Sequence, residues 1–351
     1  MGSFLQQLLN GVVLGSMYAL IALGYTMVYG VLRLINFAHG DVYMFGAFMG
    51  YYLSRLSKGV QGESLLYALM IMLGAMALSA VLGILIERFA YRPGRGGAKY
   101  SMAFWLGILG AVLGRFAAPG IGSLVAGVAV GAVVGLIVEK YFVRTIPRAS
   151  RLALLILAIG VSFLLENGGQ LVFGADPKFF PQFISAQQMN VGDLSLNNQQ
   201  ITVFVVAVIL MLLLNGVVNY TKTGKAMRAV SFNLDAAKLM GINTDRIIAA
   251  TFAIGSALAA AGGILVSLNY PKIDPLMGIM PGLKAFVAAV LGGIGNIPGA
   301  MLGGFIIGIA EVMVVGYLES TYRDAIAFSI LILILLLKPA GIMGKGLVEK
   351  V

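Results

Sequence analysis

Long apolar runs separated by short polar gaps are the dominant pattern of this chain. Runs of about 18 or more apolar residues are typical of transmembrane helices, and the alternating pattern of an outer-membrane barrel is absent. We therefore predict an all-α polytopic membrane protein with about ten transmembrane or half-membrane helices. The predicted spans lie near residues 4–30, 42–53, 64–86, 101–118, 121–138, 152–173, 201–219, 247–268 and 324–337, and the run 282–319 holds the rest.

The composition supports a membrane protein and excludes several other classes. A mean hydropathy of +0.96 with only 11% charged residues excludes an ordinary soluble chain. The net charge of +10 comes from basic residues at the ends of the apolar runs, so it indicates orientation and not nucleic-acid binding. The chain has no cysteine and one histidine, so we expect no disulfide, no thiol chemistry and no metal site.

The first apolar run begins without the basic region of a secretory signal. We therefore expect it to remain in the mature protein, with the N-terminus outside. The long, weakly charged loop 174–200 is also expected outside, because Lys and Arg near the ends of spans mark the cytoplasmic side.

The segment 220–246 is a long polar interruption that carries five of the 24 Lys and Arg residues. Its basic excess predicts a cytoplasmic loop. Within it, DAAKLMGI is typical of a short amphipathic helix that begins near Asp235 and ends at Gly241. The segment would present a small docking surface to a soluble partner.

The segment RLINFAHGD, residues 33–41, brings four polar side chains between two spans: Arg33, Asn36, His39 and Asp41. Polar groups at membrane depth are costly and tend to face a bundle interior or an aqueous cavity. Two interpretations are open. The segment either lines a pathway, or forms a cytoplasmic turn in which Arg33 and Asp41 cap helix ends.

Two basic flanks enclose a predicted transmembrane hairpin at residues 94–146. Glu87-Arg88-Phe89 before it is echoed by Glu139-Lys140-Tyr141 after it, at an offset of 52 residues. A duplicated or inserted hairpin accounts for the echo, and it leaves the orientation of the following spans unchanged because both flanks are basic.

Glu166 and Asn167 lie inside a predicted span, where an ionisable group is a functional-site hypothesis by default. The alternative is that Glu166 caps or pairs at the outer interface. Apart from Glu166, few charged groups are candidates for a position deep in the spans.

The stretch GGIGNIPGA interrupts the run 282–319 with Gly292, Gly293, Gly295 and Asn296. Glycine and Pro298 disfavour a continuous helix there. Broken backbone at membrane depth suits a polar solute pathway. A tight loop between two ordinary spans, with Gly295, Gly299 and Gly303 packing against a neighbour, is the alternative.

No motif of an enzyme is present. The chain has no phosphate-binding Gly-x-x-x-x-Gly-Lys-Ser/Thr loop, no nucleophile elbow and no HExxH pattern. If the protein pumps a solute, the energy comes from another chain.

Several motifs together resemble the permease of a branched-chain amino acid ABC transporter of the LivH type. They cover most of the chain, in order: INFAHGD at 35–41, ERFAYRP at 87–93, RLALLILAIGVSFLLEN at 151–167, FGADPK at 173–178, the segment 220–246 and FVAAVLGGIGNIPGAMLGG at 286–304. Residues from about 94 to 146 lie outside the resemblance.

The resemblance implies a 1–351 transmembrane permease domain in a bacterial inner membrane, with its C-terminus in the cytoplasm. Its partners would be a second homologous permease, two cytoplasmic ATPase subunits that bind ATP and Mg, and a periplasmic substrate-binding protein. DAAKLMG resembles the coupling loop of importer permeases, with Asp in place of Glu. The residues implied to meet the ATPase are Gly224, Asp235, Ala236, Ala237 and Gly241.

The resemblance also implies the substrates leucine, isoleucine and valine, and a weakly selective pathway. The candidate pathway residues are Asn36, His39, Asp41, Glu166, Asn167, Gly292, Gly293, Gly295 and Asn296. Two other functions stay open: a permease of the same broad family for urea, short amides or a sugar, and a self-sufficient channel or secondary transporter. The latter usually shows paired ionisable groups deep in its spans.

Overall fold

The structure is a computed structural model of the chain. It describes residues 2–56, 64–94, 151–184, 187–192 and 194–344, with short helical pieces between 107 and 136. The chain divides into two compact units, of which the larger is Met1–Gly83 with Ser162–Val351 and the smaller is Ile84–Val161.

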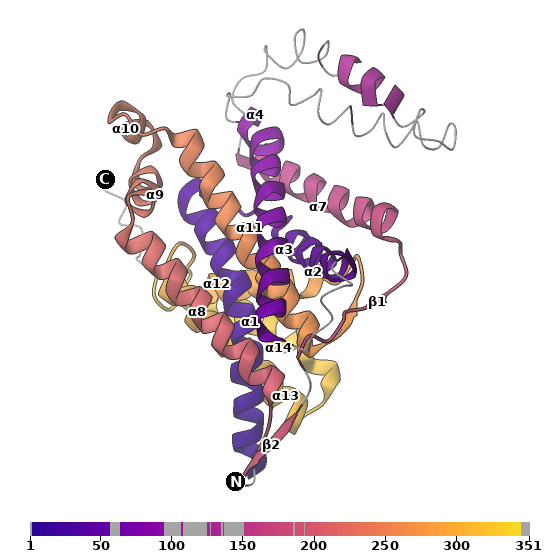
Figure 1. The fold of residues 1–351 in the computed structure, drawn as a ribbon. Helices are drawn as coiled ribbons and strands as arrows, with labels where there is room; N and C mark the ends of the chain where they lie inside the picture. The colour runs from indigo at the N-terminus through magenta and orange to yellow at the C-terminus, as the bar shows by residue number, and fades with distance from the viewer. Residues whose placement is uncertain are drawn as a thin grey trace. The chain divides into compact units, whose positions relative to one another are not determined.

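Apolar helices build the larger unit (Figure 1). Among the described residues, seven helical stretches are long and apolar enough to cross a membrane. The prediction of an all-α polytopic membrane protein is confirmed. The helices are α1 (Gly2–Leu32), α2 (His39–Leu56), α3 (Leu65–Ile86), α7 (Arg151–Phe173), α8 (Asn198–Tyr220), α9 (Lys222–Phe232), α10 (Leu234–Leu239), α11 (Thr244–Asn269), α12 (Ile279–Gly292), α13 (Ile297–Tyr317) and α14 (Arg323–Leu337), with a 3₁₀ turn η3 (Ser320–Tyr322) before the last.

The smaller unit contains the end of α3, a π-helical stretch η1 (Glu87–Tyr91), the short α4 (Arg92–Gly94) and the first part of α7. Apart from short helical pieces, the hairpin predicted at residues 94–146 lies outside the described residues. Its existence and its role therefore stay predictions.

Small residues let α1 and α13 approach closely. A Cβ atom added at Gly11 would lie 2.7 Å from Cα of Ile309, and one at Gly15 would lie 2.7 Å from Cα of Phe305. No side chain larger than hydrogen fits at either position without a shift of the main chain. The small-residue spacing of Gly11 and Gly15 therefore marks a true helix contact, as expected where packing drives helix association in lipid.

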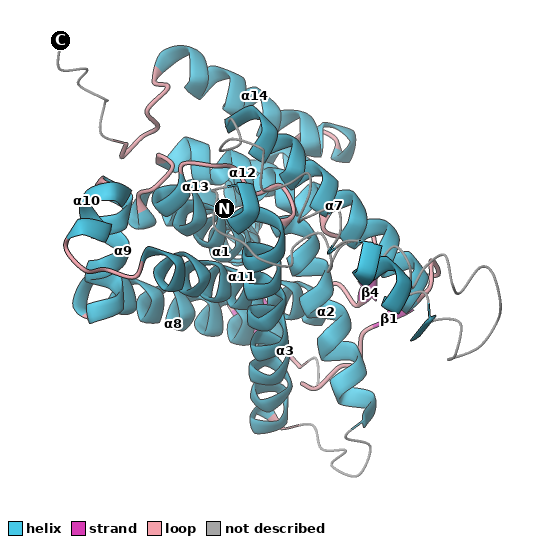
Figure 2. Ribbon diagram, turned by 90° about the horizontal axis from the view of Figure 1, so that it is seen from above, coloured by secondary structure: helices cyan, strands magenta, loops and turns pink. Residues whose placement is uncertain are grey.

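Helix α2 crosses α11 instead of running alongside it (Figures 1 and 2). A Cβ at Gly50 would lie 3.0 Å from Ile264, and one at Gly263 would lie 3.2 Å from the main chain of Ala47. A Cβ at Gly46 would collide with the main chain of Ala260, so small residues of both helices allow this close contact. The crossing carries the start of α2 into the interior of the unit.

Helix α1 connects two distinct ends of the larger unit. At its start, Gln6 exchanges two hydrogen bonds of 2.9 Å with the main chain of Ser195, in β3 (Leu194–Asn197). At its other end, the hydroxyl of Ser231 on α9 donates to the carbonyl of Gly30 at 2.5 Å. We call these the strand end and the α9 end; Figure 1 shows the N-terminus beside β2 and, at the opposite end of α1, α9 with α10.

In the part of the chain that the structure describes, four short strands lie outside the helices. β2 (Gln188–Val191) pairs antiparallel with β3, with Gln188 opposite Asn197. β1 (Lys178–Phe179) pairs antiparallel with β4 (Lys272–Ile273), with Lys178 opposite Ile273. The loop predicted at 174–200 therefore contains local strand structure that the apolar pattern did not indicate.

Helix α12 is a short helix. Its 14 residues make a helix of about 21 Å, which is less than the roughly 30 Å of a bilayer core. The chain reaches it from β4 by a stretch that passes the start of α2: a Cβ at Gly40 would lie 2.6 Å from the carbonyl of Gly278. Within 271–317, the main non-helical stretch thus precedes α12.

Candidate functional site

The segment between α8 and α11 forms two short helices instead of a single one. Asparagine and threonine side chains mark each boundary: Thr221 accepts from the main chain of Gly224, Asn233 accepts from Asp235 and Ala236, and Asn243 accepts from Arg246. Such residues satisfy the free N–H groups of a helix start. Gly241 follows α10 with a positive φ of 81°, which ends the helix.

The predicted short helix is confirmed as α10, while the separate helix α9 was not predicted. Met227 and Val230 lie at helical spacing and are buried, so α9 does carry an apolar stripe. This stripe was overlooked because the basic residues around it were interpreted as a loop, and Asn233 fits a loop as well as a cap. The capping pattern Thr221, Asn233 and Asn243 is the signal that identifies these boundaries.

An exposed apolar surface covers this segment. Phe232 and Leu239 are each 89% exposed and Met240 is 82% exposed. We call the exposed residues Phe232, Asp235, Ala236, Leu239, Met240 and Gly241 the α10 knob. Exposed apolar side chains that lie close together are typical of an interaction surface.

The predicted coupling residues divide into two groups. Asp235, Ala236 and Gly241 lie on the α10 knob. Gly224 and Ala237 are buried within the chain itself. A Cβ at Gly224 would collide with the main chain of Val217 and Val218, so Gly224 permits the turn from α8 into α9 and offers no surface to a partner.

The polar start of α2 is buried. Asn36 is 4% exposed, His39 1% and Asp41 2%. The His39 ring packs edge-on against Tyr25 with centroids 4.7 Å apart. Arg33, by contrast, is exposed just after α1, and Asp41 lies in the first turn of α2, so the choice between a pathway lining and a turn that caps helix ends stays open.

Helix α7 supplies a polar partner for this start. The hydroxyl of Ser162 donates to the carboxylate of Asp41 at 2.5 Å. Glu166, one turn further along α7, is half-buried, and Asn167 is exposed with its amide donating to the carbonyl of Phe163 at 2.7 Å. The structure thus brings Asp41 to α7, whereas Asn167 faces away from the interior of the described unit.

Gly292, Gly293, Gly295 and Asn296 form the turn between α12 and α13 at the α9 end. A Cβ at Gly295 would lie 3.7 Å from Cα of Gly30, in the last turn of α1. Asn296 caps α13 by accepting from Gly299 at 3.1 Å. A tight turn joins the two helices, and Gly303 packs against the main chain of Ala288. Because α12 is shorter than an ordinary span, the choice between a broken helix and two full spans stays open.

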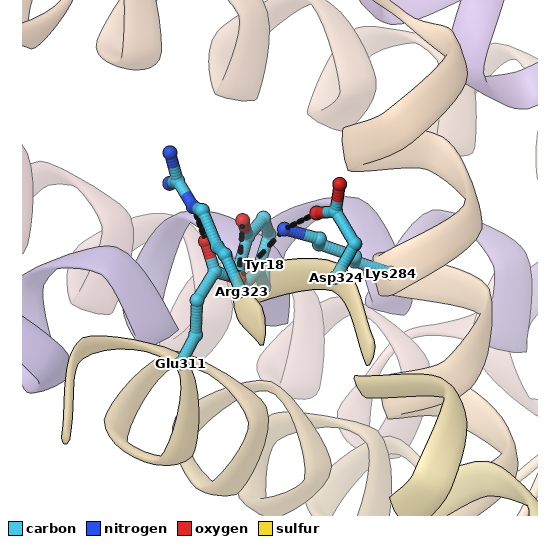
Figure 3. A network of polar contacts seen from close by, with 5 residues as sticks. All are labelled: Tyr18, Lys284, Glu311, Arg323 and Asp324. Atoms are coloured by element: carbon cyan, nitrogen blue, oxygen red, sulfur yellow. Dashed lines mark hydrogen bonds and ion pairs between the residues drawn. The ribbon is translucent and has the colours of Figure 1, made fainter. Parts of the chain in front are cut away.

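A buried network of charges joins four helices, and sequence reasoning missed it (Figure 3). The ammonium of Lys284 on α12 lies 3.0 Å from the carboxylate of Glu311 on α13 and 2.7 Å from that of Asp324 on α14. Arg323 pairs with the other oxygen of Glu311. The hydroxyl of Tyr18 on α1 donates to Glu311 at 2.9 Å.

The network is balanced in charge and graded in exposure. The side chains of Lys284 and Glu311 are 4% and 1% exposed, whereas those of Arg323 and Asp324 are 44% and 47% exposed. Two cations face two anions, so each buried charge is compensated, as low-dielectric surroundings require.

Lys284 and Glu311 are the only charged residues between 279 and 318. Isolated charges in so long an apolar run are the sequence signal that could have identified this pair.

No group of three or more His, Cys, Asp or Glu suited to a metal ion occurs among the described residues.

Comparisons with known proteins identify the family. The family described as "Branched-chain amino acid transport system / permease component" matches residues 7–95 and 97–336. The LivH permease of Escherichia coli K12 is 40% identical over 355 residues, and that of Salmonella typhimurium 39% over 355, each covering 99% of this chain and 98% of the relative. BraD of Pseudomonas aeruginosa is 38% identical over 357 residues, with the same coverage. These relatives are named as high-affinity branched-chain amino acid transport system permease proteins. The chain belongs to the family of branched-chain amino acid transport permeases.

Proposed function

We propose that this chain is the transmembrane permease subunit of an ATP-driven importer that moves leucine, isoleucine and valine across a bacterial inner membrane. The observation that carries the proposal is the likeness to LivH and BraD over 99% of the chain. The multi-pass helical fold agrees with it. The chain itself is not an enzyme in this proposal, and the partner ATPases bind ATP and Mg.

The positive-inside rule supports a cytoplasmic position for the α9 end. Lys222, Lys225, Arg228, Lys238 and Arg246 all lie between α8 and the first turn of α11. Cytoplasmic loops near spans are rich in such residues. Because α1 joins the two ends, this assignment puts the N-terminus and β3 outside, and Lys338 with the C-terminal residues after α14 inside.

The α10 knob is the surface that an ATPase subunit would grip. Phe232, Leu239 and Met240 provide apolar anchors, and a few such anchors carry most of the free energy of an interface. Asp235 and Gly241 lie between them on the same short helix and its end. Gly224 and Ala237 hold the knob in position from within.

The mechanism follows from this arrangement. This chain forms the pathway together with a second homologous permease. When the two ATPases close on each other, they move the α10 knob. The helix bundle then changes from an arrangement open to the outside to one open to the cytoplasm. A periplasmic binding protein delivers the selected solute at the strand end. The polar start of α2, with Asn36, His39 and Asp41, and the facing Glu166 are the groups of this chain that we assign to the pathway.

The self-sufficient transporter is the second candidate, and the Lys284–Glu311 pair is the observation that bears on it. Paired ionisable groups deep in the spans are what such a transporter usually shows, so this pair favours it. Lys284 and Glu311 are paired with each other and with Asp324 and Arg323. Loss of uptake without the ATPase, while the membrane potential is intact, separates the two functions.

The direct test uses the complex reconstituted in liposomes with its ATPases and its binding protein. We expect ATP-dependent uptake of labelled leucine, isoleucine and valine, and no uptake of urea, short amides or sugars. Uptake of one of the latter in place of the amino acids contradicts the substrate. Uptake of any solute by the isolated permease contradicts the ATP-driven mechanism.

The docking surface has its own test. Leu239→Glu puts a charge among the apolar anchors, and we expect loss of ATPase copurification. Met189→Glu, at a residue that is 52% exposed in β2, is the matched control and is expected to keep the complex.

Asp235→Lys and Gly241→Leu are expected to keep the protein in the membrane and to separate ATP hydrolysis from uptake. Unchanged coupled transport in these variants refutes the assignment.

A further inference from the structure

Helix α9 is tied to the bundle through the last turn of α1. The last carbonyl groups of a helix have no partner within the helix. Gly30 is one of the final residues of α1, and its carbonyl accepts from the hydroxyl of Ser231 on α9 at 2.5 Å. Ser231 thus supplies a hydrogen bond that the helix itself does not provide, across 201 residues of sequence.

The same turn of α1 touches the turn between α12 and α13. A Cβ at Gly30 would lie 3.5 Å from Cα of Gly295, and one at Gly295 would lie 3.7 Å from Cα of Gly30. The two main chains are therefore neighbours, with room for an added Cβ at ordinary contact distance on either side. Gly295 has a φ of 94°, which a residue without Cβ adopts readily.

The C-terminal segment 338–344 fastens this turn. The amides of Ile342 and Met343 donate to the last carbonyls of α12, on Leu291 and Gly292, at 2.8 and 3.0 Å. The amide of Asn296 donates to the carbonyl of Met343 at 2.8 Å, while its oxygen caps α13. The turn is thus bonded on both sides and has little freedom to move independently.

Helix α12 then leads to the buried polar groups. A Cβ at Gly40 would lie 2.6 Å from the carbonyl of Gly278, just before α12. His39 and Asp41 flank Gly40 at the buried start of α2. A displacement of α12 along its axis would therefore reach the start of α2.

We propose that the last turn of α1, the α12–α13 turn and segment 338–344 form one rigid relay, which conveys movement of α9 and α10 to α12, with Ser231 as the positioning residue. The inference rests on the proposed function. In this proposal Gly292, Gly293, Gly295 and Asn296 transmit movement and do not line the solute pathway. The pathway is lined by the start of α2 and by α7.

The first test measures solute moved per ATP hydrolysed in the reconstituted complex. Ser231→Ala removes one hydrogen bond, so we expect the ratio to fall about threefold or more while hydrolysis continues. Ser231→Thr keeps the hydroxyl and should restore the ratio. Thr202→Val is the matched control, because it removes a hydroxyl bond of 3.0 Å that stays within α8, and its ratio should equal that of the unaltered complex. An unchanged ratio in Ser231→Ala overturns the relay.

The second test uses the absence of cysteine from the chain. Gly30→Cys with Gly295→Cys places two thiols within reach of a disulfide. Uptake is compared between the reduced and oxidised states of one preparation, so any cost of the substitutions cancels. A rigid relay predicts equal uptake in both states. Loss of uptake on oxidation and recovery on reduction would mean that the two turns separate, which overturns it. Failure of the unaltered complex to show ATP-dependent uptake contradicts the proposed function instead.

Discussion

The buried charge network makes a quantitative prediction about stability. Replacing Glu311 by leucine removes the acceptor of three groups: Tyr18, Lys284 and Arg323. Two cations then share the single carboxylate of Asp324. Breaking a buried ion pair from one side costs about 3–5 kcal/mol, and we expect a loss of that size for Glu311→Leu.

Lys284→Met should cost less. Glu311 keeps Arg323 as a partner, and Asp324 is half exposed, so water replaces the lost ammonium. The expected loss is about 1–3 kcal/mol, the range for a hydrogen bond to a charged group. When both residues are changed, the remaining charges are the half-exposed neighbours Arg323 and Asp324, which compensate each other.

The double variant should therefore be more stable than the sum of the single costs predicts, by at least about 1 kcal/mol. All variants are made in a Tyr18→Phe background, because the buried hydroxyl would otherwise lose its acceptor in both Glu311 variants. Reversible unfolding of the purified protein in mixed micelles measures the four free energies of the cycle. Single costs that add within about 0.5 kcal/mol would refute the network as a coupled unit.

Three further predictions follow from packing, capping and topology. Gly15→Ala should destabilise the α1–α13 contact by about 1–3 kcal/mol, because its Cβ would lie 2.7 Å from Cα of Phe305, while Gly216→Ala, with no atom within 4 Å, should not; equal unfolding midpoints would contradict this. Asn233→Ala should cost about 1 kcal/mol of α10 stability, seen as faster amide exchange in α10 alone. Deletion of residues 94–146 should leave the orientation of the later spans intact, and a C-terminus that becomes protease-accessible from outside would be the opposite result.

The spans were predictable because their signal is local. Each apolar run between about 4–30 and 324–337 that the structure describes is a helix, since a backbone in lipid must satisfy its own hydrogen bonds. The close packing of α1 at Gly11 and Gly15 was also predictable. Two small residues four positions apart lie on the same face of a helix, where they let another helix approach closely.

The depth of polar groups was not predictable in the same way. Hydropathy could not decide whether His39 and Asp41 lie in water or in the bundle, because their burial depends on how the neighbouring helices pack around the start of α2. The sequence of residues 292–296 resembled a helix break in the middle of the membrane. The structure places these residues at the α9 end, through a contact between Gly295 and Gly30, which is far from them in the sequence.

The charge network was missed for the same reason. Lys284 and Glu311 are 27 residues apart in an apolar run, and each alone resembles a residue at a span end. Only the packing of α12 on α13 brings their side chains to 3.0 Å. Pairing between spans is a property of the folded bundle, and no local pattern encodes it.

The central claim is that the α10 knob faces the cytoplasm, where soluble ATPases reach it. Because the chain has no cysteine, Leu239→Cys and Met189→Cys give single reporters at exposed residues of the α9 end and the strand end. A membrane-impermeant maleimide is added to cells with an opened outer membrane. We predict that Cys at 189 is labelled at once and that Cys at 239 is labelled only after the inner membrane is permeabilised. Labelling of position 239 in intact spheroplasts would contradict the account.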